Sequence, residues 1–137
     1  SRVSYTLSEN VENLQLTTSL GISGTGNGLS NQIVGNSGAN VLDGRGGADI
    51  LTGGAGVDTF VFQRGEAAND VVTDFAGAGV AGGDVLRLVG FGSAAFISQV
   101  AGTDFYQVHA DPAFGGFVET IQLAGVSNLS AGDYVFI

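Results

Sequence analysis

The sequence predicts an all-β fold, with a parallel β-roll over residues 1–66 and a β-rich cap over residues 67–137. Glycine makes up 24 of the 137 residues, well above its usual share of about 7%. A nine-residue repeat runs through residues 26–61. Beyond residue 67 several segments alternate apolar and polar residues and none has a helical period, which favours antiparallel strands in the cap.

The repeat has three fixed columns in four consecutive units. They are Gly at position one (Gly26, Gly35, Gly44, Gly53), Asn or Asp at position six (Asn31, Asn40, Asp49, Asp58) and a large apolar residue at position eight (Ile33, Leu42, Leu51, Phe60). The Gly and Asx positions favour a turn, and the last three residues favour a short strand whose middle side chain points inward. Each unit is then half a coil, so units two apart should stack about 4.8 Å from each other. The position-eight side chains would form a thin core.

Residues 53–61 match every fixed position of the nonapeptide G-G-x-G-x-D-x-U-x, and the other units depart from it at one or more glycines. The region therefore resembles the RTX (repeats-in-toxin) family. The resemblance implies a right-handed parallel β-roll, bound calcium, and a place near the C-terminus of a bacterial protein exported by type I secretion. The expected location is secreted or cell-surface.

Stacked turns should direct backbone carbonyls and position-six side chains into the gap between them. Such an all-oxygen cage suits Ca²⁺ better than Mg²⁺ or Zn²⁺. The resemblance implies two sites. The first would use Asn31 and Asp49 with the carbonyls of Gly26, Gly28, Arg45 and Gly47, and the second Asn40 and Asp58 with those of Gly35, Ser37, Gly54 and Gly56. Each site has one Asn where the family prefers Asp, which predicts weaker binding.

Asp49 and Asp58 are the last position-six residues of their stacks. Further ligands could close the outer side of each, and the candidates are Glu66, Asp70, Asp74 and Asp84. The competing interpretation is a calcium-free solenoid whose Asn side chains hydrogen-bond along the stack. It suits Asn31 and Asn40, but it suits Asp49 and Asp58 less well because neighbouring unneutralised carboxylates repel each other.

Thirteen acidic residues against four Arg give a net charge of -9, which argues against nucleic acid or anionic lipid as a partner. No apolar run is long enough for a membrane span, and cysteine is absent. No catalytic motif is visible, and the one histidine, His109, is expected to face water. We therefore expect a non-catalytic chain, whose parent protein could still be an enzyme.

The segment Asp133–Ile137 is one acidic residue followed by apolar ones. It resembles the C-terminal tip of type I secreted proteins, where an uncleaved export signal lies, and it is also compatible with a final β-strand. The expected function is a module that folds on binding calcium outside the cell and supports secretion and stability of a larger protein. Its partners would be calcium and the type I secretion machinery.

The alternative function is a polysaccharide-binding module of a secreted carbohydrate-active enzyme, such as a mannuronan epimerase. Exposed aromatic residues would support it. We expect Phe105, Tyr106 and Phe114 to lie in the sheet core rather than to form a sugar platform.

Overall fold

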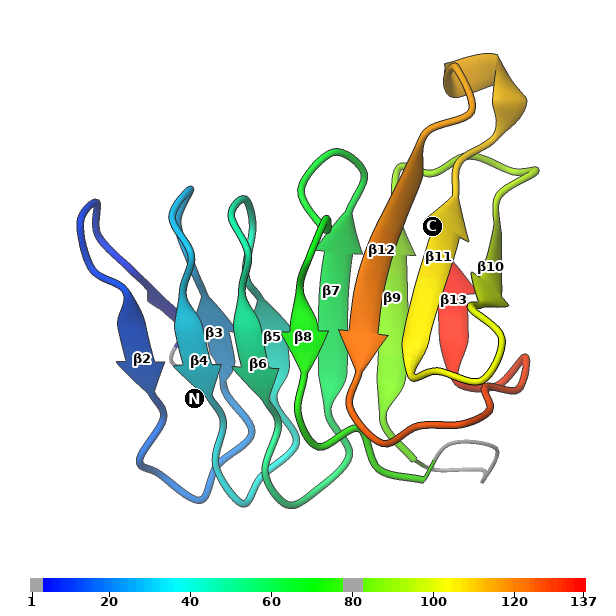
Figure 1. Ribbon diagram of the computed structural model, residues 1–137. Helices are drawn as coiled ribbons and strands as arrows, with labels where there is room; N and C mark the ends of the chain where they lie inside the picture. Colours follow the sequence, from blue (N-terminus) through cyan, green and yellow to red (C-terminus); the bar gives the residue numbers. More distant parts are fainter. Residues whose placement is uncertain (1–3, 78–82) are drawn as a thin grey trace.

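The computed structural model describes residues 4–77 and 83–137, which form two facing β-sheets (Figure 1). Sheet A contains, in spatial order, β1 (Tyr5–Thr6), β3 (Ser23–Thr25), β5 (Val41–Asp43), β7 (Thr59–Gln63), β9 (Val85–Val89) and β13 (Tyr134–Phe136). Sheet B contains β10 (Phe96–Gln99), β11 (Phe105–His109), β12 (Val118–Leu123), β8 (Val71–Val72), β6 (Ile50–Thr52), β4 (Gln32–Val34) and β2 (Asn13–Gln15). A short 3-10 helix, η1 (Pro112–Phe114), joins β11 to β12.

The chain alternates between the sheets from β2 to β9, so each pair of consecutive strands makes one coil (Figure 1). Neighbouring strands of the repeats are parallel and in register. Ile33 in β4 pairs with Leu51 in β6, and Leu42 in β5 pairs with Phe60 in β7. These pairings confirm the 18-residue coil that the repeat predicts.

The core of the roll is the position-eight column. Ile33, Leu42, Leu51 and Phe60 are each 0% exposed. Their strand neighbours face outward or are half-buried, which gives each three-residue strand only one inward side chain. This arrangement confirms the predicted thin apolar core.

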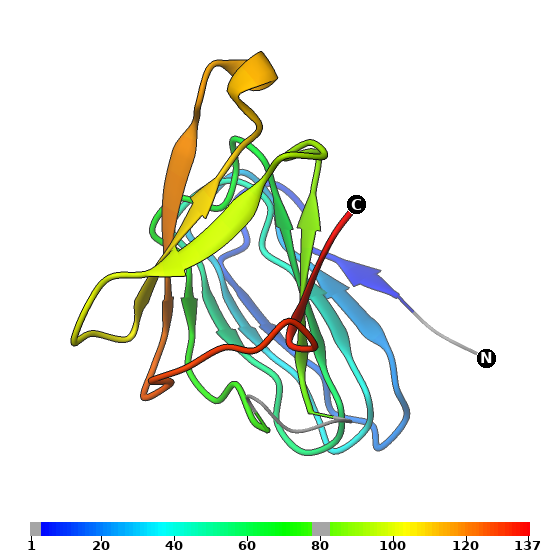
Figure 2. The same ribbon diagram turned by 90° about the vertical axis from the view of Figure 1, so that its right-hand side faces the viewer.

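The part of the chain beyond residue 67 contains β-strands, as predicted, but their pairing is mixed. The strands β10, β11 and β12 are antiparallel, as expected for the cap. In contrast, β8 and β12 continue sheet B in parallel, and β9 and β13 continue sheet A in parallel. The two sheets of the roll therefore run on past residue 66, and β10 and β13 form their outer edges at the cap end (Figure 2).

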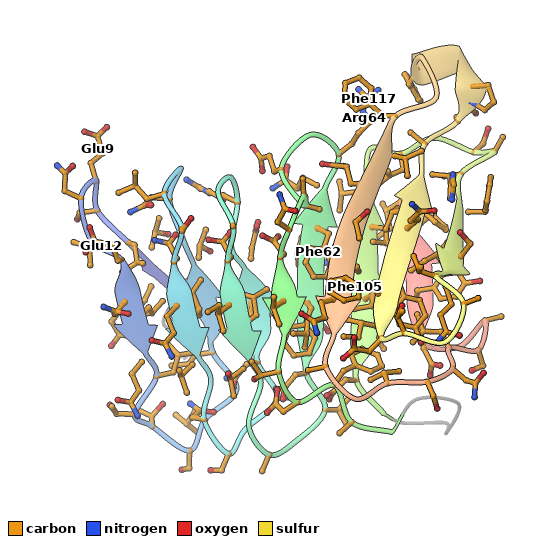
Figure 3. The ribbon with its side chains drawn as sticks, in the orientation of Figure 1. Glu9, Glu12, Phe62, Arg64, Phe105 and Phe117 are labelled. Atoms are coloured by element: carbon orange, nitrogen blue, oxygen red, sulfur yellow. The ribbon has the colours of Figure 1, made fainter. Side chains whose placement is uncertain are left out.

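The expectation for the cap aromatics holds in part. Tyr106 is buried and donates a hydrogen bond from its hydroxyl to the Val126 carbonyl, at 3.0 Å. Phe105 and Phe114 are 41% and 45% exposed, so the prediction that they lie in the core is wrong. Phe105 lies in an outward position of β11 (Figure 3). Phe114 lies in η1, where the Arg64 guanidinium is 4.3 Å from the centre of its ring.

No helix among residues 4–77 and 83–137 is long and apolar enough to cross a membrane.

Candidate metal centre

The position-six residues form one column along each edge of the roll. On the first edge the Asn31 N–H donates to Asp49 Oδ1 at 2.7 Å, and the Asp49 N–H donates to Asp70 Oδ1 at 2.9 Å. On the second edge the Asn40 and Asp58 N–H groups donate to Asp58 Oδ1 and Asp84 Oδ1, both at 2.8 Å. The columns are thus 31–49–70 and 40–58–84. Asp70 and Asp84 close the stacks of Asp49 and Asp58, although both lie outside the four repeats.

The two Asn residues are satisfied without an ion. Asn31 Oδ1 and Asn40 Oδ1 each accept a hydrogen bond from the N–H of position two of their own turn, both at 2.8 Å. Their amide groups, together with those of Asn27 and Asn36 at position two, donate to carbonyls of the preceding coil. The acceptors are Ser8 and Val11 for Asn27, Val11 for Asn31, Leu20 for Asn36 and Ile22 for Asn40.

The two Asp residues of the repeats are not satisfied in this way. Asp49 Oδ2 and Asp58 Oδ2 are buried and have no hydrogen-bond partner among the described residues. Each oxygen lies over the position-one glycine of its own turn, where a Cβ added to Gly44 or Gly53 would collide with the carboxylate. The glycine therefore leaves room for a carboxylate oxygen that still requires a positive partner.

The backbone conformation of the turns also differs between the first two repeats and the last two. Positions two and four of the last two turns have left-handed φ, at Arg45 (65°), Gly47 (115°), Gly54 (97°) and Gly56 (112°). In the first two turns, Asn27 and Asn36 at position two do not lie in this region. The side-chain difference at position six is therefore accompanied by a difference in backbone path.

The turn carbonyls that the sequence singled out are free. These are the carbonyls of Gly26, Gly28, Arg45, Gly47, Gly35, Ser37, Gly54 and Gly56. None of them accepts a hydrogen bond from any residue within 4–77 or 83–137. Backbone oxygens with unused lone pairs are therefore available in the turns of Asp49 and Asp58 and in the turns of the repeats that pair with them.

Burial changes the acidity of these carboxylates. It raises the pKa of Asp49 and that of Asp58 from 3.8 to about 6, although a backbone hydrogen bond to each opposes the rise. Burial likewise raises the pKa of Asp70 to about 8, and the nearby charges of Asp49, Glu119 and Asp43 add to the rise. Without a metal ion, the ionised carboxylates of Asp49 and Asp58 therefore destabilise the folded state at neutral pH.

The residues around Asp49 and Asp58 suit a calcium ion that is bound by carboxylate and backbone oxygens together. Nowhere in the described part of the chain do three or more His, Asp or Glu side chains gather as a metal cluster. The unpartnered oxygens of Asp49 and Asp58, with the free carbonyls beside them, match the preference of Ca²⁺ for carboxylate and backbone oxygen together.

The other candidate ligands have different surroundings. Asp74 accepts hydrogen bonds from the N–H groups of Gly53 and Gly54, both at 2.8 Å, so its carboxylate closes the turn directly. Asp84 Oδ2 accepts the Ala76 N–H at 2.8 Å. Glu66 Oε2 is buried and has no partner among the described residues, so Glu66 resembles Asp49 and Asp58 in this respect.

Glu119 in β12 is a further buried acidic residue beside this centre, and the repeat pattern does not predict it. It is 5% exposed, and its carboxylate accepts hydrogen bonds from the Gly65 and Ala67 N–H groups at 3.0 and 3.2 Å. It therefore covers the turn before Asp70 from the cap side. The signal was present in the sequence, because Glu119 shares the inward phase of β12 with Ile121 and Leu123.

His109 lies apart from this centre. It is half-buried, stacks on Phe96 with the ring centroids 4.2 Å apart, and its Nε2 is 2.9 Å from Ser98 Oγ. No carboxylate within 4–77 or 83–137 hydrogen-bonds to its ring. The Ser98–His109 pair thus lacks the third member that orients the histidine in a nucleophilic triad.

No curated protein sequence matches the chain. A family model that describes a nonapeptide repeat does match part of the chain. Repeats of this type bind Ca²⁺ and are typical of extracellular proteins that leave bacteria by type I secretion. Residues 25–60 match the model of the RTX calcium-binding nonapeptide repeat, and the chain carries four copies of that repeat.

Proposed function

We propose that this chain is a non-catalytic module that folds when it binds Ca²⁺ through the turns around Asp49 and Asp58. The observation that carries the proposal is the pair of buried, unpartnered carboxylate oxygens in those turns. The ligands would be Asp49 and Asp58, the free turn carbonyls beside them, and the side-chain oxygens of Asn31 and Asn40. Calcium supplies the positive charge that the chain lacks at these points.

The energetics support coupling of binding to folding. The net charge of -9 and the buried carboxylates oppose the compact state when calcium is scarce. An ion that binds only the native state stabilises it by RT ln(1 + [L]/Kd), about 2.7 kcal/mol at a hundredfold excess over Kd. Calcium is abundant outside cells, so a parent protein exported unfolded by type I secretion would gain its fold there.

Isothermal titration of calcium into calcium-depleted protein, followed by circular dichroism, tests the proposal. We expect two or more ions to bind with a gain of β signal. The double variant Asp49→Asn, Asp58→Asn copies the chemistry of the first two repeats and removes two charges. It should lose most of the binding.

The matched control is Glu9→Gln, Glu12→Gln, which removes the same charge from exposed side chains of the first coil (Figure 3). It should bind calcium as the native sequence does. The proposal fails if the calcium-depleted chain already gives the full β signal, or if the Asp49 and Asp58 variant binds calcium as the control does.

A further inference from the structure

The strand β10 is a free edge at the end of sheet B remote from the N-terminus. Among the described strands it pairs with β11 alone, and it is the outermost strand of sheet B (Figures 1 and 2). With four residues it is also the longest of the four edge strands, since β1 has two and β2 and β13 have three each. A free edge of this kind offers a template for another strand.

The ladder fixes which backbone groups of β10 point outward. The Val100 N–H donates to the Phe105 carbonyl at 2.9 Å, and residues in an antiparallel pair alternate between bonded and non-bonded positions. Ser98 and Phe96 therefore also bond to β11. The N–H and C=O groups of Ile97 and Gln99 point away from the sheet.

The side chains of β10 show no protection against pairing. Natural edges often carry Lys, Pro or an inward charge, whereas β10 reads Phe-Ile-Ser-Gln and continues into Val100. Phe96 and Val100, on the outer face, are 54% and 38% exposed. The strand is thus a neutral, partly apolar strip on a strongly acidic molecule.

We infer that β10 is a self-association edge whose partner is β10 of a second copy of this chain, in antiparallel orientation. The strand is self-complementary about Ser98. With a two-fold axis at Ser98, Ile97 lies opposite Gln99 of the other copy, and all four outward N–H and C=O groups of each copy are paired. Phe96 then lies opposite Val100, so both exposed apolar side chains gain a cross-strand contact.

The symmetry explains why the partner is a second copy rather than an unrelated strand. A two-fold contact presents the same patch twice, so each good pairing occurs in duplicate. The absence of charge in β10 matters here, because a charged residue at Ser98 would meet its own copy directly. Two copies of sheet B would join into one continuous sheet across the axis.

Cysteine crosslinking tests this register cleanly because the chain contains no cysteine. The Ser98→Cys variant, oxidised in calcium, should form a disulfide-linked dimer, since residues opposite each other at a non-bonded position have Cα atoms about 4.5 Å apart. The control Gln107→Cys lies on the same outer face one strand further in. It should stay monomeric.

Two further variants test the orientation. Phe96→Cys and Val100→Cys should crosslink to each other when mixed, and each should crosslink far less when alone. Sedimentation of the unmodified chain should show a reversible shift toward twice 13.7 kDa as concentration rises. The variant Gln99→Pro removes an outward N–H and should remove that shift while circular dichroism stays unchanged.

The inference fails if Ser98→Cys crosslinks no faster than Gln107→Cys. It also fails if the native chain stays monomeric at about 1 mM, where even an association of −4.1 kcal/mol would be visible.

Discussion

The pH of the solution should control the stability of the calcium-free protein through Asp49 and Asp58. Their carboxylates are fully buried, and burial raises the pKa of each from 3.8 to about 6. A group whose pKa is higher in the folded state stabilises the fold while it is protonated in that state. The contribution is complete below pH 3.8 and is lost as the pH rises through 6.

The size of the effect follows from these values. The rise in pKa from 3.8 to about 6 corresponds to roughly 3 kcal/mol for each carboxylate, so the two together lose about 6 kcal/mol of stabilisation between strongly acid pH and pH 7.5, roughly half of it above pH 5. Asp70, with a pKa of about 8, acts in the same direction up to higher pH. Since a domain is stable by about 5–15 kcal/mol in all, the calcium-free chain should be folded near pH 5 and largely unfolded near pH 8.

Urea unfolding followed by circular dichroism in calcium-depleted buffers from pH 4.5 to 8 measures this loss. With saturating calcium the trend should reverse over the same range, because the ion binds ionised carboxylates. The Asp49→Asn, Asp58→Asn variant should flatten the calcium-free profile. A calcium-free midpoint that is equal or higher at pH 8 than at pH 5 would refute the reasoning.

Two substitutions test the roll itself. Leu51→Ala should cost about 2–5 kcal/mol in calcium-saturated urea unfolding, whereas Ile50→Ala, at a 44% exposed position, should cost far less. Gly44→Ala places a Cβ against the Asp49 carboxylate and should weaken calcium binding in titration calorimetry. Gly132→Ala, outside the repeats, enters open space and should leave binding unchanged, and an equal loss in both would contradict the role of position one.

The part of the fold that follows the strict nine-residue period could be predicted from the sequence. The period fixes the coil length, the inward column from Ile33 to Phe60 and the stacking of alternate turns. The same period does not place Asp70 and Asp84, because they follow the preceding position-six residue by 21 and 26 residues instead of 18. A periodic pattern cannot align residues across such insertions.

The pairing of the cap was harder to predict for another reason. Alternation shows that β12 and β13 are strands, but it does not show which neighbour each strand pairs with after a long connection. Both join the roll in parallel, at β8 and β9. The burial of Glu119 depends on the same pairing, since only the β8–β12 contact brings it to the turn at Gly65 and Ala67.

The residue at position six, Asn or Asp, determines whether the turn needs a cation to satisfy its buried polar atoms. Asn31 and Asn40 bring their own N–H donors to the preceding coil, so the first coils need no cation. The carboxylates of Asp49 and Asp58 contain only hydrogen-bond acceptors, so their buried oxygens require a cation or a proton as partner. Yet only four of the nineteen buried apolar side chains among the described residues precede residue 44. The coils before residue 44 therefore have too little apolar core to fold alone, and calcium removal near pH 8 should unfold them together with the turns around Asp49 and Asp58.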